Sequence, residues 1–212
     1  MIKSGQYLKN SGIIDRKRLL DVSKELFRKS IHMCSAFVPV ALGIAYYPTL
    51  IALGAVLVFY VISEILRLNG VQVPFISAVT AAAARKRDEN RFVLGPVTMC
   101  VGVIISAILW DKIPYTVGIF SLAFGDGLAS LAGKLFGRIT IPFTKGKTVA
   151  GSLTCFTAVF VSSWCVTKNT LASLIIASFA MFIEVLPLKD FDNLLIPVLI
   201  GGISQFLLYV CF

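Results

Sequence analysis

Long apolar segments dominate the chain, and short polar stretches rich in Lys and Arg separate them. A helix that crosses a bilayer needs about 20 mostly apolar residues, and seven segments approach that length. We therefore expect an all-α fold, a polytopic membrane helix bundle with about seven transmembrane helices. The seven segments are Ile31–Tyr47, Leu50–Leu66, Phe92–Leu109, Pro114–Leu131, Val149–Val166, Leu171–Leu186 and Leu194–Phe212.

Composition and charge support this reading. Hydrophobic residues make up 57% of the chain, charged residues 15%, and the mean hydropathy is +0.86. A net charge of +9 would suggest nucleic acid in a soluble chain, but seven crossings place eighteen of the twenty Lys and Arg residues on one side. We therefore exclude a nucleic-acid binder and expect a cytoplasmic N-terminus. The short, more polar segment Val71–Ala84 is expected at the membrane interface.

The chain is expected to divide into a cytoplasmic arm, residues 1–30, and an integral membrane catalytic bundle, residues 31–212. Apolar residues recur in the arm at near-helical spacing among many bases, which predicts a basic amphipathic helix on an anionic leaflet. These apolar residues are Leu19, Leu20, Val22, Leu26 and Phe27.

A polar cluster follows in the same segment. Helical spacing puts Glu25, Arg28, Lys29 and His32 on one face at the mouth of the first span. The alternative is plain membrane anchoring with an internal ion pair to Glu25. For Glu64, near the inner end of the second span, we expect only an ion pair with Arg67.

Asp126 interrupts an apolar segment, where a carboxylate is costly and usually functional. Gly125 and Gly127 flank it, so we expect a helix break there and a new helix over Gly127–Phe136 whose free N–H groups attract anions. Small residues then form a stripe on this helix: Ala129, Ser130, Gly133 and Gly137. The acid at its head favours a metal-bound phosphate on the stripe, and helix packing is the alternative.

The next loop is basic and rich in glycine and hydroxyls, a composition that suits phosphate. Its residues are Lys134, Arg138, Lys145, Gly146, Lys147, Thr148, Gly151 and Ser152. Acidic and amide side chains lie near the end of the sixth span and just beyond it: Glu184, then Asp190, Asp192 and Asn193. Carboxylates beside many bases fit Mg²⁺ bridging the phosphates of a nucleotide.

Several blocks of this sequence resemble the dolichol kinase, phytol kinase and CTP-dependent diacylglycerol kinase family, which is related to phosphatidate cytidylyltransferases. The blocks are E-L-F-R-K-S-I-H (25–32), G-D-G-L-A-S-L-A-G-K-L-F-G-R (125–138), K-G-K-T-V-A-G-S (145–152), Glu184 and D-N-L-L-I-P (192–197). The positions that match the family's motifs are Arg28, Lys29, Asp126, Gly133, Lys134, Lys147, Thr148, Gly151 and Ser152. Ala150 departs from the pattern, because many relatives carry an acid there.

The resemblance implies a membrane lipid kinase that transfers the terminal phosphate of CTP, or another nucleoside triphosphate, to the hydroxyl of a lipid alcohol. Asp126, Glu184 and Asp192 are the expected Mg²⁺ ligands. The expected phosphate-binding bases are Arg28, Lys29, Lys134, Arg138, Lys145 and Lys147. We expect Asp126, Lys147 and His32 to be catalytic, and both Asp126 and His32 qualify by type as the general base.

Two other functions stay open. Phosphatidate cytidylyltransferase-like synthesis of a CDP-lipid would use the same residues but attack the α-phosphate. A small anion transporter would line a site at the bilayer centre with Asp126, although the polar residues cluster at the cytoplasmic end.

The expected partners are the bilayer, a lipid alcohol and a nucleoside triphosphate, with a homodimer left open. The expected location is a bacterial cytoplasmic membrane, or the endoplasmic reticulum if the source is eukaryotic.

Overall fold

The structure is a computed structural model that describes residues 22–71, 91–144 and 146–211. Residues 1–21 of the predicted arm, residues 72–84 of the predicted interfacial segment and Lys145 lie outside the described residues. The described chain is helical throughout, as expected, and its one β-type contact is an isolated bridge between Thr140 and Thr148.

Helices occupy all seven predicted apolar segments. The first helix covers residues 22–34 and continues through η1 (Ser35–Phe37) into α2 (Val38–Ile44). The later helices are α3 (Tyr46–Leu68), α5 (Gly95–Leu109), α6 (Lys112–Phe120), η3 (Ser121–Asp126), α7 (Gly127–Phe136), α8 (Val149–Thr167), α9 (Thr170–Val185), α10 (Asp192–Phe206) and η4 (Leu207–Cys211).

Four stretches of the described helices are long and apolar enough to cross a membrane. They are Tyr46–Leu68, Lys112–Phe136, Val149–Thr167 and Asp192–Tyr209, and α5 and α9 are shorter apolar helices. Large apolar side chains cover the outer face of α3, where Ile51, Val58 and Phe59 are all exposed. Lipid tails solvate such a surface without cost, so the chain is a membrane protein.

Glycines allow the central helices to approach closely. A side chain at Gly102 of α5 would meet the backbone of α10, with its Cβ 2.7 Å from Asn193 O. A side chain at Gly118 of α6 would collide with Pro197 O of the same helix α10. Small residues at such crossings are the usual packing device within membranes. This packing buries the core residues Val117, Ile119, Leu122, Ile196 and Ile200.

The expected helix break at Asp126 is absent. A π-helical turn, η3, joins α6 to α7, and the Gly127 N–H donates to Phe124 O, so α7 has no free N-terminus there. A Cβ at Gly125 would lie 2.7 Å from Val159 Cγ2 of α8. Glycine at this position therefore permits close packing, and the π turn keeps Asp126 inside a continuous helix.

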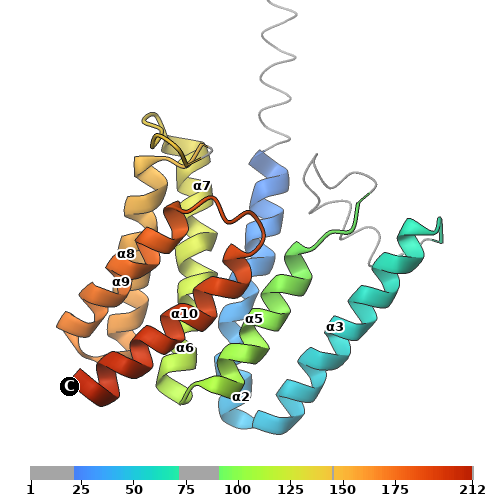
Figure 1. Ribbon diagram of the computed structural model, residues 1–212, viewed down its shortest axis with the longest axis horizontal. Helices are drawn as coiled ribbons and strands as arrows, with labels where there is room; N and C mark the ends of the chain where they lie inside the picture. Colours follow the sequence, from blue (N-terminus) through green and yellow to red (C-terminus); the bar gives the residue numbers. More distant parts are fainter. Residues whose placement is uncertain (1–21, 72–90, 145, 212) are drawn as a thin grey trace, which may run out of the picture.

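Four parts of the chain meet at one end of the bundle, the upper end in Figure 1. They are the start of the first helix, the end of α3 with the start of α5, the α7–α8 connection and the α9–α10 connection. These are the basic regions that the charge pattern assigns to one side, so the polar residues from distant segments converge there.

Candidate active site

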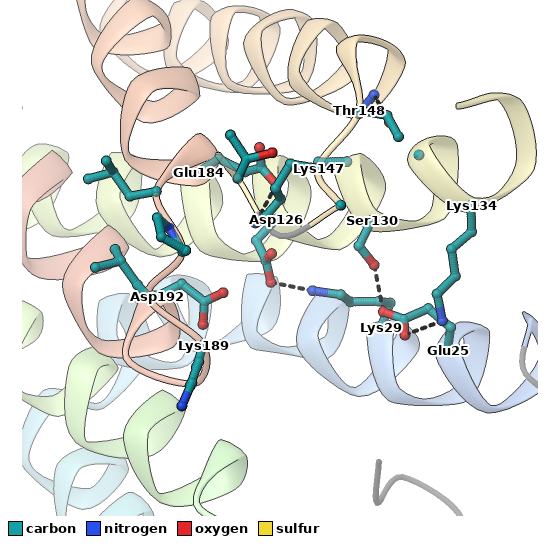
Figure 2. A pocket seen from close by; sticks show the side chains of 18 of the residues that line it. Glu25, Lys29, Asp126, Ser130, Lys134, Lys147, Thr148, Glu184, Lys189 and Asp192 are labelled. Carbon is teal, nitrogen blue, oxygen red and sulfur yellow. Dashed lines mark hydrogen bonds and ion pairs between the residues drawn. The ribbon is translucent and has the colours of Figure 1, made fainter. Parts of the chain in front are cut away.

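A cavity of about 510 Å³ lies at this end, between the first helix, α7, the start of α8 and the α9–α10 connection (Figure 2). Five basic and four acidic residues line it. The basic residues are Arg28, Lys29, Lys134, Lys147 and Lys189, and the acidic ones are Glu25, Asp126, Glu184 and Asp192. This nearly balanced set differs from the purely basic pocket that free phosphate would favour.

Asp126 is buried in the floor of the cavity and pairs with the first helix. The Lys29 ammonium donates to its Oδ2 atom, and both side chains are at most 4% exposed. His32 Nδ1 lies 3.4 Å from the same oxygen. Three residues that the sequence assigns to the site therefore meet, although Lys29 and Asp126 stand 97 positions apart.

The polar face of the first helix points inward. Glu25 and Lys29 are buried, whereas Leu26 and Phe27 are 55% and 41% exposed. Residues 22–30 therefore place Glu25 and Lys29 against the bundle, and their outer face carries Leu26 and Phe27 together with Lys24 and Ser30. The division of the chain at residue 30 stays a prediction, because the first helix runs through that position without interruption.

Glu25, which the sequence placed in a polar cluster of the first helix without a role in the site, is a residue of the cavity lining. It pairs with Arg28, and it also accepts from Ser130 Oγ at 2.6 Å and from Lys134 Nζ at 2.7 Å on α7. Burial would raise the pKa of Glu25, but the charge of Arg28 and the hydrogen bond from Lys134 outweigh burial and lower this pKa to about 2. Glu25 therefore holds the first helix to α7 as a carboxylate.

Lys147 and Glu184 form a third ion pair, with 2.7 Å between Nζ and Oε1. Burial would lower the pKa of Lys147, but the charge of Glu184 and the hydrogen bond to it outweigh burial and raise this pKa above its ordinary value. The other oxygen of Glu184, Oε2, is buried and has no hydrogen-bond partner among the described residues. A buried carboxylate oxygen of this kind is available to a ligand in the cavity.

The small-residue stripe on α7 packs mainly against the start of α8. Cβ atoms added at Gly133 and Gly137 would both crowd the Thr148 side chain, and one at Gly151 would lie 2.9 Å from Ala129 O. Thr148 also caps α8, since its Oγ1 accepts from Gly151 N at 3.2 Å. Helix packing, the alternative considered for this stripe, accounts for these contacts, Gly133 also lines the cavity, and phosphate binding along the stripe stays a prediction.

Most of the predicted site residues line the cavity, and a few do not. Those that line it are Arg28, Lys29, Asp126, Gly133, Lys134, Lys147, Thr148, Gly151, Glu184 and Asp192. Arg138 is exposed and Ser152 is buried, and neither lines the cavity. The sequence placed Ser130 only on the small-residue stripe and did not assign Lys189 to the site, although both are lining residues.

The predicted pair of Glu64 with Arg67 is confirmed. Arg67 donates to both carboxylate oxygens of Glu64 at 2.8 Å, and Val93 N donates to Oε1. Glu64 is therefore occupied in joining α3 to the start of α5, away from the cavity.

Comparison with known proteins supplies the relatives of this chain. It is 30% identical over 146 residues to Probable phytol kinase 3 of Glycine max, which covers 59% of this chain and 46% of that protein. It is 26% identical to CTP-dependent diacylglycerol kinase 1 of Saccharomyces cerevisiae, over 66% of this chain and 49% of the yeast protein. It is also 30% identical over 82 residues to the farnesol kinase of Arabidopsis thaliana, over 38% of this chain and 27% of that protein.

The chain is a homologue of these lipid-alcohol kinases. The resemblance expected from its motifs is thereby confirmed. The chain spans about half the length of the first two relatives. No family model matches it, and no solved structure does.

Proposed function

We propose that this chain is a membrane lipid kinase that transfers the terminal phosphate of a nucleoside triphosphate to the hydroxyl of a lipid alcohol. The observation that carries the proposal is the convergence of the kinase-like motifs on one cavity. Arg28 and Lys29, Asp126, Lys134 and Lys147 come from separate segments and line the same space. Phosphoryl transfer depends mostly on positioning and charge neutralisation, and such a cavity supplies both.

The basic residues would hold the triphosphate. Lys29, Lys134 and Lys147 each pair with a carboxylate, which fixes their ammonium groups at the cavity wall before a ligand arrives. Preorganised charges of this kind stabilise the charge that develops on transferring phosphoryl oxygens. The Lys145 side chain, also expected to bind phosphate, lies outside the described residues.

Mg²⁺ fits this cavity as a partner of the nucleotide. No three His, Cys, Asp or Glu side chains gather into a cation site in the described part of the chain. Mg²⁺ is usually held by one or two carboxylates together with substrate phosphates, so a full protein cage is unnecessary. Glu184, through its unpartnered Oε2, and Asp126 or Asp192 would hold the ion, which would neutralise phosphate charge.

CTP is the proposed donor. The support for CTP is the yeast relative, whose name states CTP dependence.

We further propose seven membrane crossings, with the cavity on the cytoplasmic face. The first helix together with α2 forms one crossing, α6 together with α7 forms another, and α3, α5, α8, α9 and α10 form one each. The gathering of basic segments at one end of the bundle supports this orientation. A bacterial cytoplasmic membrane is the proposed location.

Product analysis tests the function. Purified protein in lipid nanodiscs is incubated with Mg²⁺, a panel of lipid alcohols and phosphatidate, and CTP labelled at either the α- or the γ-phosphate. We expect γ-label in a lipid phosphate and release of CDP. Transfer of α-label into lipid with release of pyrophosphate would establish cytidylyl transfer instead. Label in no lipid, with competent substrates present, would favour the transporter.

A further inference from the structure

A second cavity, of about 430 Å³, lies against the same first helix, between it, α3 and α5. Most of its wall is apolar, with Leu53 and Leu57 from α3 and Met99 and Val103 from α5. Val56 also lines it and is 62% exposed, so the cavity reaches the lipid-facing surface of α3. Ligand sites for hydrophobic molecules have this composition and size.

Polar residues in the lining connect this cavity to the first one, and Ser35, Tyr60 and Asn193 line it as well. Arg28 lines both cavities. His32 lines the second cavity, and its Nδ1 lies 3.4 Å from the oxygen of Asp126, which lines the first. The α9–α10 connection is shared in the same way, since Asp192 lines the first cavity and Asp190 the second. A polar wall therefore separates a charged space from an apolar one.

We infer that the second cavity binds the hydrocarbon part of the lipid alcohol, with the hydroxyl at Arg28 and His32. The inference rests on the proposed kinase function and adds the place of the acceptor. A lipid alcohol needs an apolar space open to the bilayer with one polar end facing the phosphate donor. The second cavity has both properties, and its polar end is the wall that it shares with the first cavity, where the triphosphate is proposed to bind.

The transfer step follows from this placement. The lipid oxygen forms a bond to the terminal phosphorus, and the bond from that phosphorus to the bridging oxygen of the nucleotide breaks. The nucleoside diphosphate leaves with the electron pair, and the hydroxyl proton passes to water at the polar wall.

Another cavity, between α6 with η3 and α8, is a poorer acceptor site. Phe120, Phe124, Leu153 and Val161 line it, and none of the described residues in its lining is charged. No described residue lines both this cavity and the first one. An alcohol bound there could meet the hydroxyls of Thr154, Thr157 and Ser162, but these do not connect it to the first cavity.

Photocrosslinking tests the assignment without requiring turnover. A long-chain alcohol that carries a diazirine a few carbons from its hydroxyl is irradiated with the protein in nanodiscs, and the adducts are mapped by mass spectrometry. We expect adducts on residues 31–38, 53–60 and 93–103, suppressed by excess unlabelled alcohol. Adducts on α6 and α8, or adducts spread over all lipid-facing helices, would overturn the assignment. Because no phosphate is transferred, this result stands apart from success or failure of the kinase assay.

A filled cavity gives a second test. Cys100 lines the cavity on α5, and Cys100→Phe adds a ring there, whereas Ile108→Phe places the same ring on the exposed face of α5. We expect Cys100→Phe to raise KM for the lipid alcohol about tenfold with an unchanged KM for the nucleotide, and Ile108→Phe to change neither. An unchanged lipid KM in folded Cys100→Phe would contradict the inference. If that variant does not fold, the crosslinking result decides.

Discussion

The Lys29 ammonium donates to Asp126 Oδ2, which joins the first helix to the π-helical turn in the middle of the bundle. Both groups are buried, and His32 lies beside the same carboxylate. The pair therefore connects two of the blocks that carry the family resemblance, residues 25–32 and 125–138. It also fixes an acid and a base at the wall between the two cavities, where the proposed reaction takes place.

Removal of Lys29 should destabilise the protein strongly. Lys29→Met leaves the Asp126 carboxylate buried without its ion-pair partner, and we expect a loss of about 3–5 kcal/mol in the free energy of unfolding. Chemical unfolding in mixed micelles measures this loss. Lys24→Met, at an exposed position of the same helix, is the control and should change stability by less than about 0.5 kcal/mol.

A double variant separates stability from activity in this pair. Lys29→Met combined with Asp126→Leu removes both charges, so most of the lost stability should return. Phosphorylation should stay absent, because the groups that the proposal assigns to catalysis are gone. Recovery of both stability and activity would show that the pair is only structural.

The Glu25 cluster predicts a change of stability in acid. The pKa of Glu25 is lowered from 4.5 to about 2 in the folded protein, so its stabilising contribution is complete above about pH 4.5. That contribution is lost progressively as the pH falls through the folded value. The free energy of unfolding, measured between pH 6 and pH 2, should therefore decrease more steeply with falling pH for the wild type than for Glu25→Gln. Equal slopes for the two proteins would argue against the cluster.

Basic residues near the cavity should differ in their effect on nucleotide binding. Lys147 lines the cavity, so Lys147→Gln should raise the nucleotide KM about tenfold or more, the loss expected for one charge-assisted hydrogen bond. Arg138 is exposed and lies outside the cavity lining. Arg138→Gln should leave that KM within about twofold of the wild type. Steady-state kinetics on the two variants side by side provides the comparison, and equal effects would contradict the assignment.

Close packing between α7 and α8 makes Gly151 sensitive to substitution. A Cβ at this position would lie 2.9 Å from Ala129 O, so Gly151→Ala should cost about 1–3 kcal/mol of stability. At Gly54 on α3, no atom of the described residues lies within 4 Å of the same added Cβ. Gly54→Ala should therefore be neutral or stabilising by up to about 1 kcal/mol, since alanine favours the helix. Thermal unfolding in detergent distinguishes the two, and a stable Gly151→Ala would contradict the packing described.

Much of the fold could be predicted because apolar length and helical spacing are local properties. All seven apolar segments contain helices, and the pairs Glu25 with Arg28 and Glu64 with Arg67 follow from neighbours on one helix turn. The charge pattern likewise indicated which connections share one end of the bundle.

Tertiary contacts account for what the sequence could not predict. Gly125 indicates a helix break by its intrinsic preference, but contact with Val159 of α8 explains the glycine and the helix continues. Nothing in the spacing of residues predicts that Glu25 meets Lys134 or that Lys147 meets Glu184. The second cavity is also invisible in the sequence, because its wall consists of ordinary apolar residues from three distant segments.

The most direct test of the account compares wild type with Asp126→Asn in a single-turnover assay with γ-labelled CTP, Mg²⁺ and a lipid alcohol in nanodiscs. Both proteins should be matched for folding and for nucleotide binding. We predict rapid labelling of the lipid by the wild type and a rate at least about 100-fold lower for Asp126→Asn, because the carboxylate acts on the reacting groups. Transfer of the γ-phosphate by folded Asp126→Asn at the wild-type rate would contradict the account.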